Sequence, residues 1–346
     1  MLLQGVLLMS QWIDLEKEVL KYHRLLNLVV SLRGHGKTSA AKKLAISNYE
    51  KTGKKTLWVR RYKKELGAKF YARFATDFET IGIENPGKYI MRNGELVEDL
   101  GEKKYETVIK FSTLSQSLYE KSDNFSQYNL MIFDEFLITK SNINYMPDEV
   151  NVFLEYLNTV MRFREDFTVL LMGNHVTNYN PYYNYFNITV DPTKENFVLR
   201  KEFLFKFVRS HEFEEFSKKS RFADVVKDTP YYDYAYEGAA NRESRNIVQR
   251  RPNKTTVMCN IMHRHKKYTL YFCSEETSLY IDNFVDNKAV TLNTYQEDGE
   301  PGTTFYRADT VKTLSRLIKT ICNNNMIFAA NNKVAQDAQE IINVFS

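Results

Sequence analysis

The 346-residue chain contains few cysteines, prolines and glycines, and each scarcity excludes a class of protein. Its three cysteines, Cys259, Cys273 and Cys322, form no CxxC pair and leave an odd count, so we expect a reducing environment and no disulfide framework. Seven prolines and 13 glycines beside 43% hydrophobic residues exclude a collagen-like or low-complexity chain. No apolar run approaches the roughly 20 residues of a membrane-spanning helix. The sequence therefore predicts a soluble, intracellular globular protein without a membrane partner.

Charge is nearly balanced overall, at +5, but it is unevenly distributed. Residues 51–73 contain nine Lys or Arg and one acid, and residues 242–267 contain eight and one. After residue 267 the balance reverses to six bases and ten acids. Basic segments of this kind are typical of contact with phosphate backbones, but also of ordinary solvated faces, so both interpretations remain open.

Two domains are expected from the length, because domains usually have roughly 100–200 residues. Within 25–210, strand-like and helix-like segments alternate. We expect strands at 25–30, 56–61, 105–111, 129–133 and 168–173, and helices at 38–49, 63–79 and 147–164. This alternation predicts an α/β domain over 1–210, with a mainly parallel sheet and helices on both faces.

The rest of the chain has a different pattern. Residues 211–241 are charged and then rich in Tyr, Asp and Gly, which indicates a linker or hinge. Residues 242–346 show short β-rich runs followed by a helix, a strand and a closing helix. We expect strands at 246–251, 256–262, 268–273, 278–282 and 326–330, and helices at 308–323 and 334–345. This order predicts a smaller α+β domain.

The stretch LLNLVVSLRGHGKTSAAKKLAI places a buried strand before a glycine-bearing turn and a helix. Such a turn lets backbone N–H groups surround phosphates at a helix N-terminus. The expected cofactor-binding residues are Ser31, Leu32, Arg33, Gly34, His35, Gly36, Lys37 and Thr38. Lys37 would reach the β- and γ-phosphates of ATP, and Thr38 would ligate Mg²⁺. The consensus GxxxxGK[ST] has glycine where Ser31 stands, which leaves the detailed loop geometry open.

Two carboxylates follow the apolar run NLMIF, which places Asp134 and Glu135 at the end of a buried strand. Ligands of open α/β sheets bind at this end of the strands. We expect Asp134 to hold Mg²⁺ opposite Thr38 and Glu135 to act as the general base for water. Asp134 lies 97 residues after Lys37, a separation that allows their two strands to be neighbours.

Two further polar residues are candidates for the γ-phosphate. Asn174 follows the apolar segment 168–173 and is placed to sense that phosphate by hydrogen bonding, although turn residues are also common there. Arg162 lies near the end of an expected helix. It is a candidate for an arginine finger acting on a neighbouring subunit's ATP, but basic residues also commonly end helices.

Three functions are compatible with these motifs alone. The first is an ATPase, and the second is a P-loop kinase, which would not normally need Glu135 beside Asp134. The third is a nucleotide-gated nucleic-acid-binding scaffold without turnover. DNA-stimulated activity would distinguish the ATPase from the kinase.

Several uncommon segments occur together in one order, and with them the chain resembles the packaging ATPases of phi29-like tailed phages. They are YHRLLNLVVSLRGHGKT, WVRRYKKEL at 58–66, MIFDEF at 131–136, SNINYMPDEV at 141–150, NTVMRFRE at 158–165, NPYYNYF at 180–186 and KKSRFADVV at 218–226. The resemblance covers most of the chain. It departs from the family pattern at Ser31.

The resemblance implies an ATP-hydrolysing, DNA-translocating enzyme of the additional-strand P-loop NTPase class, with a RecA- or FtsK-like sheet. The implied assembly is a homomeric ring, usually a pentamer, that moves double-stranded viral DNA through the phage portal, or connector, into a procapsid. That places it in the host cytoplasm at the portal vertex, with or without a structural RNA. Arg162 matches the family's trans-acting arginine, and Lys63 matches another interfacial basic residue.

In this family the C-terminal domain resembles an RNase H-type nuclease that has lost its activity. The order of elements expected over 242–346 agrees with that fold. Two-metal nucleases need clustered carboxylates, and the segment 256–262 contains none. We therefore expect this domain to bind nucleic acid or a motor partner.

Overall fold

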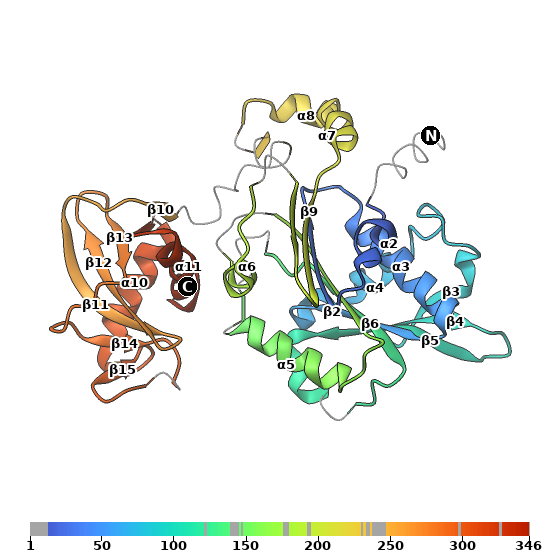
Figure 1. Ribbon diagram of the computed structural model, residues 1–346, viewed down its shortest axis with the longest axis horizontal. Coiled ribbons are helices and arrows are strands. Elements are labelled where there is room, and N and C mark those ends of the chain that lie inside the picture. The colour runs from blue at the N-terminus through green and yellow to red at the C-terminus, as the bar shows by residue number, and fades with distance from the viewer. Residues whose placement is uncertain are drawn as a thin grey trace. The chain divides into compact units, whose positions relative to one another are not determined.

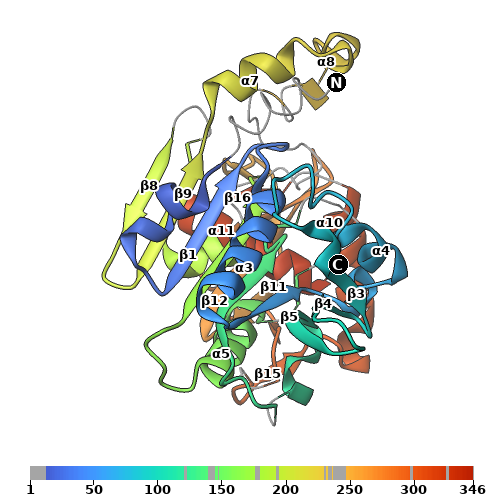
Figure 2. The same cartoon turned by 90° about the vertical axis from the view of Figure 1, so that its right-hand side faces the viewer.

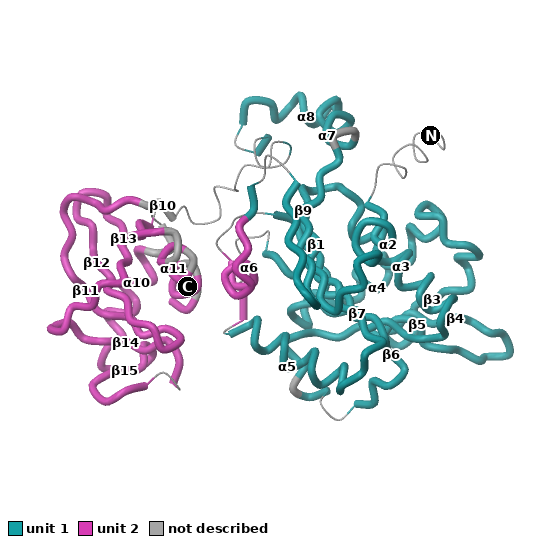
Figure 3. Tube along the Cα trace, viewed as in Figure 1, with its two compact units in different colours: residues 1–140, 148–176, 190–240 teal, residues 141–147, 177–189, 241–346 magenta. Residues whose placement is uncertain are grey.

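A computed structural model describes residues 13–120, 123–138, 145–146, 148–175, 180–191, 195–229, 231–232, 236, 247–296, 299–324 and 327–345. The chain divides into two compact units (Figure 3). The first comprises residues 1–140, 148–176 and 190–240, and the second comprises 141–147, 177–189 and 241–346. The segment 211–241, expected as a linker, is therefore grouped with the first unit almost entirely.

A nine-stranded sheet lies at the centre of the first unit, and its strand order is β3-β4-β5-β2-β6-β7-β1-β9-β8. Strands β2 to β6 and β9 of this sheet are labelled in Figure 1. The strands are β1 (Leu26–Ser31), β2 (Lys55–Arg60), β3 (Tyr89–Arg92), β4 (Glu95–Asp99), β5 (Tyr105–Thr113), β6 (Tyr128–Asp134), β7 (Thr168–Asn174), β8 (Asn196–Leu199) and β9 (Phe203–Val208). From β5 to β9 in this order all neighbours are parallel. This confirms the expected α/β class with a mainly parallel sheet.

Strand β7 lies between β1 and β6, so the expectation that these two strands could be neighbours is wrong. Leu171 pairs in register with Leu28 on one side and with Phe133 on the other. All three strands are buried and almost entirely apolar, so no alternation in the sequence distinguishes their order. The inserted strand is the additional strand of the expected P-loop class.

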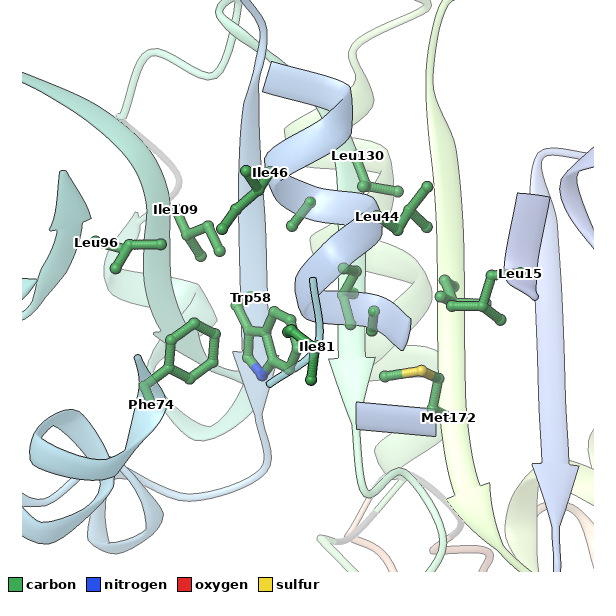
Figure 4. Packing of buried hydrophobic residues seen from close by; sticks show 14 of the residues in the cluster. Leu15, Leu44, Ile46, Trp58, Phe74, Ile81, Leu96, Ile109, Leu130 and Met172 are labelled. Atoms are coloured by element: carbon green, nitrogen blue, oxygen red, sulfur yellow. The ribbon is translucent and has the colours of Figure 1, made fainter. Parts of the chain in front are cut away.

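Helices cover both faces of this sheet. Helix α3 (Lys37–Thr52) packs one face, where Leu44 lies beside Leu130 in the same core cluster as Trp58 (Figure 4). Helix α5 (Glu149–Met161) packs the opposite face, where Phe153 stacks on Phe133 with ring centroids 5.8 Å apart. Leu130 and Phe133 differ by an odd number of positions on β6, as residues on opposite faces of a strand must.

The helix expected at 63–79 is interrupted. A short 3-10 segment, η2 (Lys63–Glu65), precedes helix α4 (Ala68–Phe74), and Gly67 between them is extended, with φ −89° and ψ 173°. Beyond α4 lies the β3–β4 hairpin, which was not predicted. Its turn is Asn93-Gly94, both with positive φ, a pair that strongly favours a two-residue hairpin.

Helix α5 is shorter than the expected 147–164, and its end has a clear cause. Arg162 and Phe163 adopt left-handed backbone conformations, with φ of 43° and 66°. The Arg164 guanidinium then turns back and donates to the carbonyl oxygens of Val160, at 2.8 Å, and Met161, at 3.1 Å. These bonds satisfy carbonyls that a helix end leaves without partners.

The second unit has a seven-stranded sheet in the order β10-β16-β13-β12-β11-β14-β15. Its elements are β10 (Ile247–Gln249), β11 (Thr255–His263), β12 (Lys266–Cys273), β13 (Ser278–Asp282), β14 (Thr291–Asn293), β15 (Thr303–Phe305), α10 (Lys312–Asn324), β16 (Ile327–Ala329) and α11 (Asn332–Phe345). The smaller sheet domain with a β-meander and two helices is as expected, although β14 and β15 were missed. Its likeness to RNase H stays a prediction.

Helix α6 (Pro181–Phe186) also belongs to the second unit. Tyr182 and Tyr183 on it are fully buried, and the Asn184 amide donates to Asp337 at 3.1 Å. These aromatic residues therefore serve packing. Among the helices that the structure describes, none is long and apolar enough to span a membrane.

Candidate active site

The turn between β1 and α3 has the backbone that a phosphate loop requires. Gly34 and Gly36 have φ of 91° and 69°, a region that residues with a side chain rarely adopt. A Cβ on Gly34 would also lie 2.9 Å from the Phe213 ring. With Lys37 and Thr38, these residues line a hollow of about 270 Å³ that also reaches Asp134 and Asn174. The structure thus brings the predicted loop and the predicted strand-end residues together.

Lys37 is buried within this turn. Its Nζ donates to Ser31 Oγ at 2.5 Å, to the Leu32 carbonyl at 3.2 Å and to Asn174 Oδ1 at 2.8 Å. Burial lowers the pKa of Lys37 to about 7, although the charges of Asp134 and Glu135 oppose this shift. Ser31, where the consensus has glycine, therefore supplies a hydroxyl that holds the lysine in place.

The Mg²⁺ candidates face each other across the hollow. Thr38 Oγ1 lies 3.4 Å from Asp134 Oδ1. Burial raises the pKa of Asp134, and the positive charge of Arg60 lowers it. One carboxylate and one hydroxyl, completed by water and phosphate oxygens, form a donor set that suits Mg²⁺.

Sequence reasoning missed Arg60, the last residue of β2, which is central to the site. Its guanidinium donates to Asp134 Oδ2 at 2.9 Å, to Glu135 Oε2 at 2.7 Å and to Glu65 Oε2 at 3.2 Å. The sequence pattern could have indicated Arg60, because β2 is an apolar strand that ends at the same edge of the sheet as β6. Arg60 therefore neutralises both candidate catalytic carboxylates.

Arg61, the next residue, was missed as well. It is buried and forms a two-point ion pair with Glu149, at 2.7 and 3.0 Å. It also donates to the carbonyl oxygens of Glu135, at 3.2 Å, and Phe136, at 2.5 Å. Glu135 has a left-handed backbone with φ 58°, so Arg61 holds a strained turn that aims the Glu135 carboxylate.

Helix α7 (His211–Lys218) covers the phosphate loop and lies in the segment expected as a linker. It follows β9 directly and is succeeded by α8 (Arg221–Val226) (Figure 2). The Phe213 ring packs on His35, with centroids 4.8 Å apart, and Glu214 lies 4.0 Å from His35. Burial, aided by the charge of Lys37, lowers the pKa of His35 to about 4. His35 is therefore an uncharged packing residue of the loop.

Arg162 lies away from this hollow, at the opposite end of α5 from the catalytic turn. Glu149 begins α5 and is joined through Arg61 to the end of β6. At the other end of α5, Arg164 Nη1 donates to the Tyr128 carbonyl, where β6 begins. The helix has 13 residues, so its ends are about 20 Å apart. The structure therefore does not bring Arg162 to the hollow that holds Lys37 and Asp134.

Two other predicted residues, Lys63 and Arg33, are exposed. Lys63 begins η2, close in sequence to Arg60 and Glu65, at the edge of the sheet that carries the site.

A second hollow of about 340 Å³ adjoins the loop and shares Ser39 with the first. Its lining is mixed: the apolar Ile13, Leu15, Ala40, Leu44 and Ile81 lie beside the charged Asp14, Glu16, Lys17 and Lys43.

Comparisons with known proteins agree with this architecture. The chain matches the family described as Podovirus DNA encapsidation protein (Gp16) over residues 11–341. It is 27% identical over 279 residues to the DNA packaging protein of Bacillus phage B103, covering 80% of this chain and 83% of that protein. It is also 27% identical over 282 residues to the DNA packaging protein of Bacillus phage phi29, covering 82% of each chain.

Solved structures share the fold. A chain of the bacteriophage phi29 genome packaging motor assembly is 24% identical, with a TM-score of 0.63, covering 97% of this chain and all (100%) of that one. The N-terminal domain of the phi29 DNA packaging ATPase is 31% identical, with a TM-score of 0.50, covering 58% of this chain and 98% of that domain. The chain therefore belongs to the Podovirus DNA encapsidation protein (Gp16) family.

Proposed function

We propose that this protein is an ATPase that drives double-stranded viral DNA into a procapsid. The observation that carries the proposal is the convergence of Lys37, Thr38, Asp134, Glu135 and Asn174 on one hollow at the carboxyl edge of the sheet. A phosphate loop facing paired carboxylates is suited to hydrolysis of a nucleoside triphosphate. The family and the names of its relatives support DNA packaging as the work performed.

The loop between β1 and α3 binds ATP. Residues 31–38 surround the phosphates, and Lys37 places its charge on the β- and γ-phosphates. Thr38 and Asp134 would hold Mg²⁺, which neutralises charge on the phosphate oxygens when it is bound. The hollow that adjoins the loop at Ser39 combines apolar side chains with polar ones, a lining suited to the base and sugar of the nucleoside.

Glu135 and Asn174 act in hydrolysis. Glu135 accepts the proton of the attacking water, and Asn174, which already bonds Lys37, reads the γ-phosphate. The ion pair of Glu135 with Arg60 must loosen before the carboxylate is free to act as a base, because a paired carboxylate is a weaker proton acceptor. Arg60 thereby links hydrolysis to the position of strand β2.

Arg162 acts in trans, on the ATP of a neighbouring copy. Its place about 20 Å from its own catalytic turn, across the 13 residues of α5, supports this role over a role in cis. The neighbouring Phe163 side chain is 94% exposed, as a residue that packs in an assembly interface would be. The proposed assembly is a homomeric ring, a pentamer by family resemblance, in which exposed Lys63 also lies at the interface.

The working complex forms in the host cytoplasm at the portal vertex of the procapsid, with or without a structural RNA. In our proposal residues 1–210, apart from 141–147 and 177–189, which group with the second unit, form the ATPase domain. Residues 211–241 connect the domains and extend over the phosphate loop, and 242–346 form an RNase H-like domain without nuclease activity. That second domain binds nucleic acid or another motor component.

ATP turnover with and without double-stranded DNA tests the proposal. We expect turnover that rises with DNA and disappears in Lys37→Ala. Transfer of phosphate to a small acceptor without any effect of DNA would favour a P-loop kinase. Binding of ATP without turnover, unaffected by Glu135→Gln, would favour the scaffold.

A further inference from the structure

The second unit concentrates its late basic residues on one hollow. After residue 267 the chain has six bases against ten acids, and four of the six line a single hollow of about 270 Å³. They are Arg307, Lys312, Arg316 and Lys319. A segment with a net negative charge therefore carries a strongly positive surface.

Three of these bases lie on one face of α10. Lys312, Arg316 and Lys319 follow one another at helical spacings of four and three residues and are exposed. The opposite face carries Ile318 and Ile321, which are buried in the core of the unit. The amphipathic helix thus fixes the three charges along about 10 Å, the axial rise of about three nucleotides of a duplex strand.

Two aromatic residues, Tyr306 and Phe345, form the floor of the hollow. Tyr306 and Phe345 pack against each other with ring centroids 5.2 Å apart. The Arg307 side chain donates to the Tyr306 hydroxyl at 2.6 Å and lies over its ring. Ser315 donates to the Tyr306 carbonyl at 2.6 Å, which anchors α10 to this floor. These contacts fix the positions of Arg307 and of the basic face of α10 relative to Tyr306.

Carboxylates pair with five of the six bases in 250–267, whereas Arg307 and Arg316 of the α10 hollow have no ion pair among the described residues. Five bases between 250 and 267 form ion pairs with carboxylates from later in the chain: Arg250, Lys254, Arg264, Lys266 and Lys267. At the α10 hollow Lys312 lies 3.5 Å from Asp309, whose side chain is 95% exposed.

We propose that the α10 hollow, lined by Arg307, Lys312, Arg316 and Lys319, binds the phosphodiester backbone of a nucleic acid duplex. This inference rests on the proposed packaging function and places its second-domain contact on α10 instead of the basic opening of the domain. Clustered Lys and Arg contacts to phosphates release counterions, so binding weakens steeply with salt. Duplex DNA and duplex RNA share this chemistry.

The test uses the full-length protein without nucleotide and measures binding across a series of salt concentrations. The double variant Arg316→Gln/Lys319→Gln is compared with a matched control, Lys254→Gln/Lys267→Gln, which removes two ion-paired bases from the same unit. The probes are a labelled DNA duplex, an RNA duplex of the same sequence and a polyglutamate peptide. Thermal unfolding checks that all variants are folded.

We expect the double variant to reduce the slope of log K against log salt by about 1.8 on DNA, at about 0.9 for each lost contact. The duplex, DNA or RNA, for which the double variant loses more affinity is the kind of nucleic acid that the hollow binds. Unchanged slopes on both duplexes, an equal loss in the control pair, or an equal loss of polyglutamate binding would each overturn the inference. Turnover without DNA should be unchanged, so a failure here is distinct from a failure of the ATPase proposal.

Discussion

Arg60 Nη2 lies 2.7 Å from Glu135 Oε2, so the carboxylate proposed to activate water is already occupied by a positive charge. The adjacent Arg61 holds the backbone of the same glutamate through its carbonyl oxygen. Two consecutive residues of the chain thus control the side chain and the main chain of one catalytic residue. Residues at the end of strand β2 therefore set the position of the catalytic turn that follows β6.

Replacing Glu135 with Gln should preserve ATP binding and abolish turnover. The amide keeps the shape of the side chain but does not accept the water's proton, and loss of a general base typically costs about 10²–10⁴-fold in rate. Single-turnover hydrolysis and nucleotide binding on the same preparation measure both effects. Turnover within about twofold of the wild type would remove Glu135 from this role.

Replacing Arg60 with Ala should move the acidic limb of the activity profile to higher pH. Asp134 must be ionised to hold Mg²⁺, burial raises its pKa and Arg60 lowers it. Without Arg60 the pKa of Asp134 rises further, so the carboxylate becomes protonated at a higher pH. ATPase rates between about pH 5 and pH 8 measure the shift. Arg60→Lys keeps one charge and should shift the limb less, and an unmoved limb in Arg60→Ala would contradict the prediction.

ATP binding above neutral pH should take up a proton at Lys37. Burial lowers the pKa of Lys37 to about 7, and the phosphates of bound ATP raise it again. Affinity should therefore fall as pH rises above about 7, where the unbound lysine loses its charge. Calorimetry in buffers of different ionisation heat measures the uptake. Lys37→Arg, which stays charged, should abolish it, and equal uptake in that variant would refute the assignment.

Mixing two inactive variants should restore activity. Arg162→Ala keeps a complete site but offers no finger, whereas Glu135→Gln offers a finger but has no working site. Each alone should be nearly inactive, because a finger supplied in trans contributes about 10³–10⁵-fold in rate. The mixture contains interfaces with an intact site and an intact finger, so DNA-stimulated turnover should return in part. A mixture no more active than its two components, with assembly verified, would rule out the trans role.

Replacing Glu149 with Ala should destabilise the first unit by about 3–5 kcal/mol, because the charge of Arg61 would stay buried without its partner. Arg61 and Glu149 have side chains only 2% and 0% exposed. Urea unfolding followed by intrinsic tryptophan fluorescence, to which buried Trp58 contributes, measures the loss. Glu149→Gln retains one acceptor and should cost less, and a loss below about 1 kcal/mol in the alanine variant would contradict the expectation.

The local part of the site could be predicted from sequence. Lys37 and Thr38 follow from a strand, a glycine turn and a helix that are adjacent in the chain, and Asp134, Glu135 and Asn174 follow from the rule that ligands bind at the carboxyl ends of parallel strands. The partners of the site could not be predicted. Arg60 and Glu135 are 75 residues apart, and Arg61 and Glu149 are 88 apart, so neither pair leaves a periodic pattern.

Elements without periodicity were missed for the same physical reason. Strands β14 and β15 have three residues each, too few for alternation to be visible. Helix α7 was obscured by the charged, tyrosine-rich segment around it, and its place over the loop follows from the packing of Phe213 on Gly34 and His35. The positive face of α10 was concealed by the net negative charge of the sequence that contains it.

Helix α5 runs antiparallel to strand β6, so one copy carries its catalytic turn and its arginine at opposite ends. With Arg162 acting in trans, the number of working sites equals the number of junctions between copies, not the number of copies. A row of n copies has n sites but only n − 1 junctions, so the copy at one end stays idle. Closing the row adds the missing junction without adding protein. Turnover per copy would therefore distinguish open from closed assemblies of the same size.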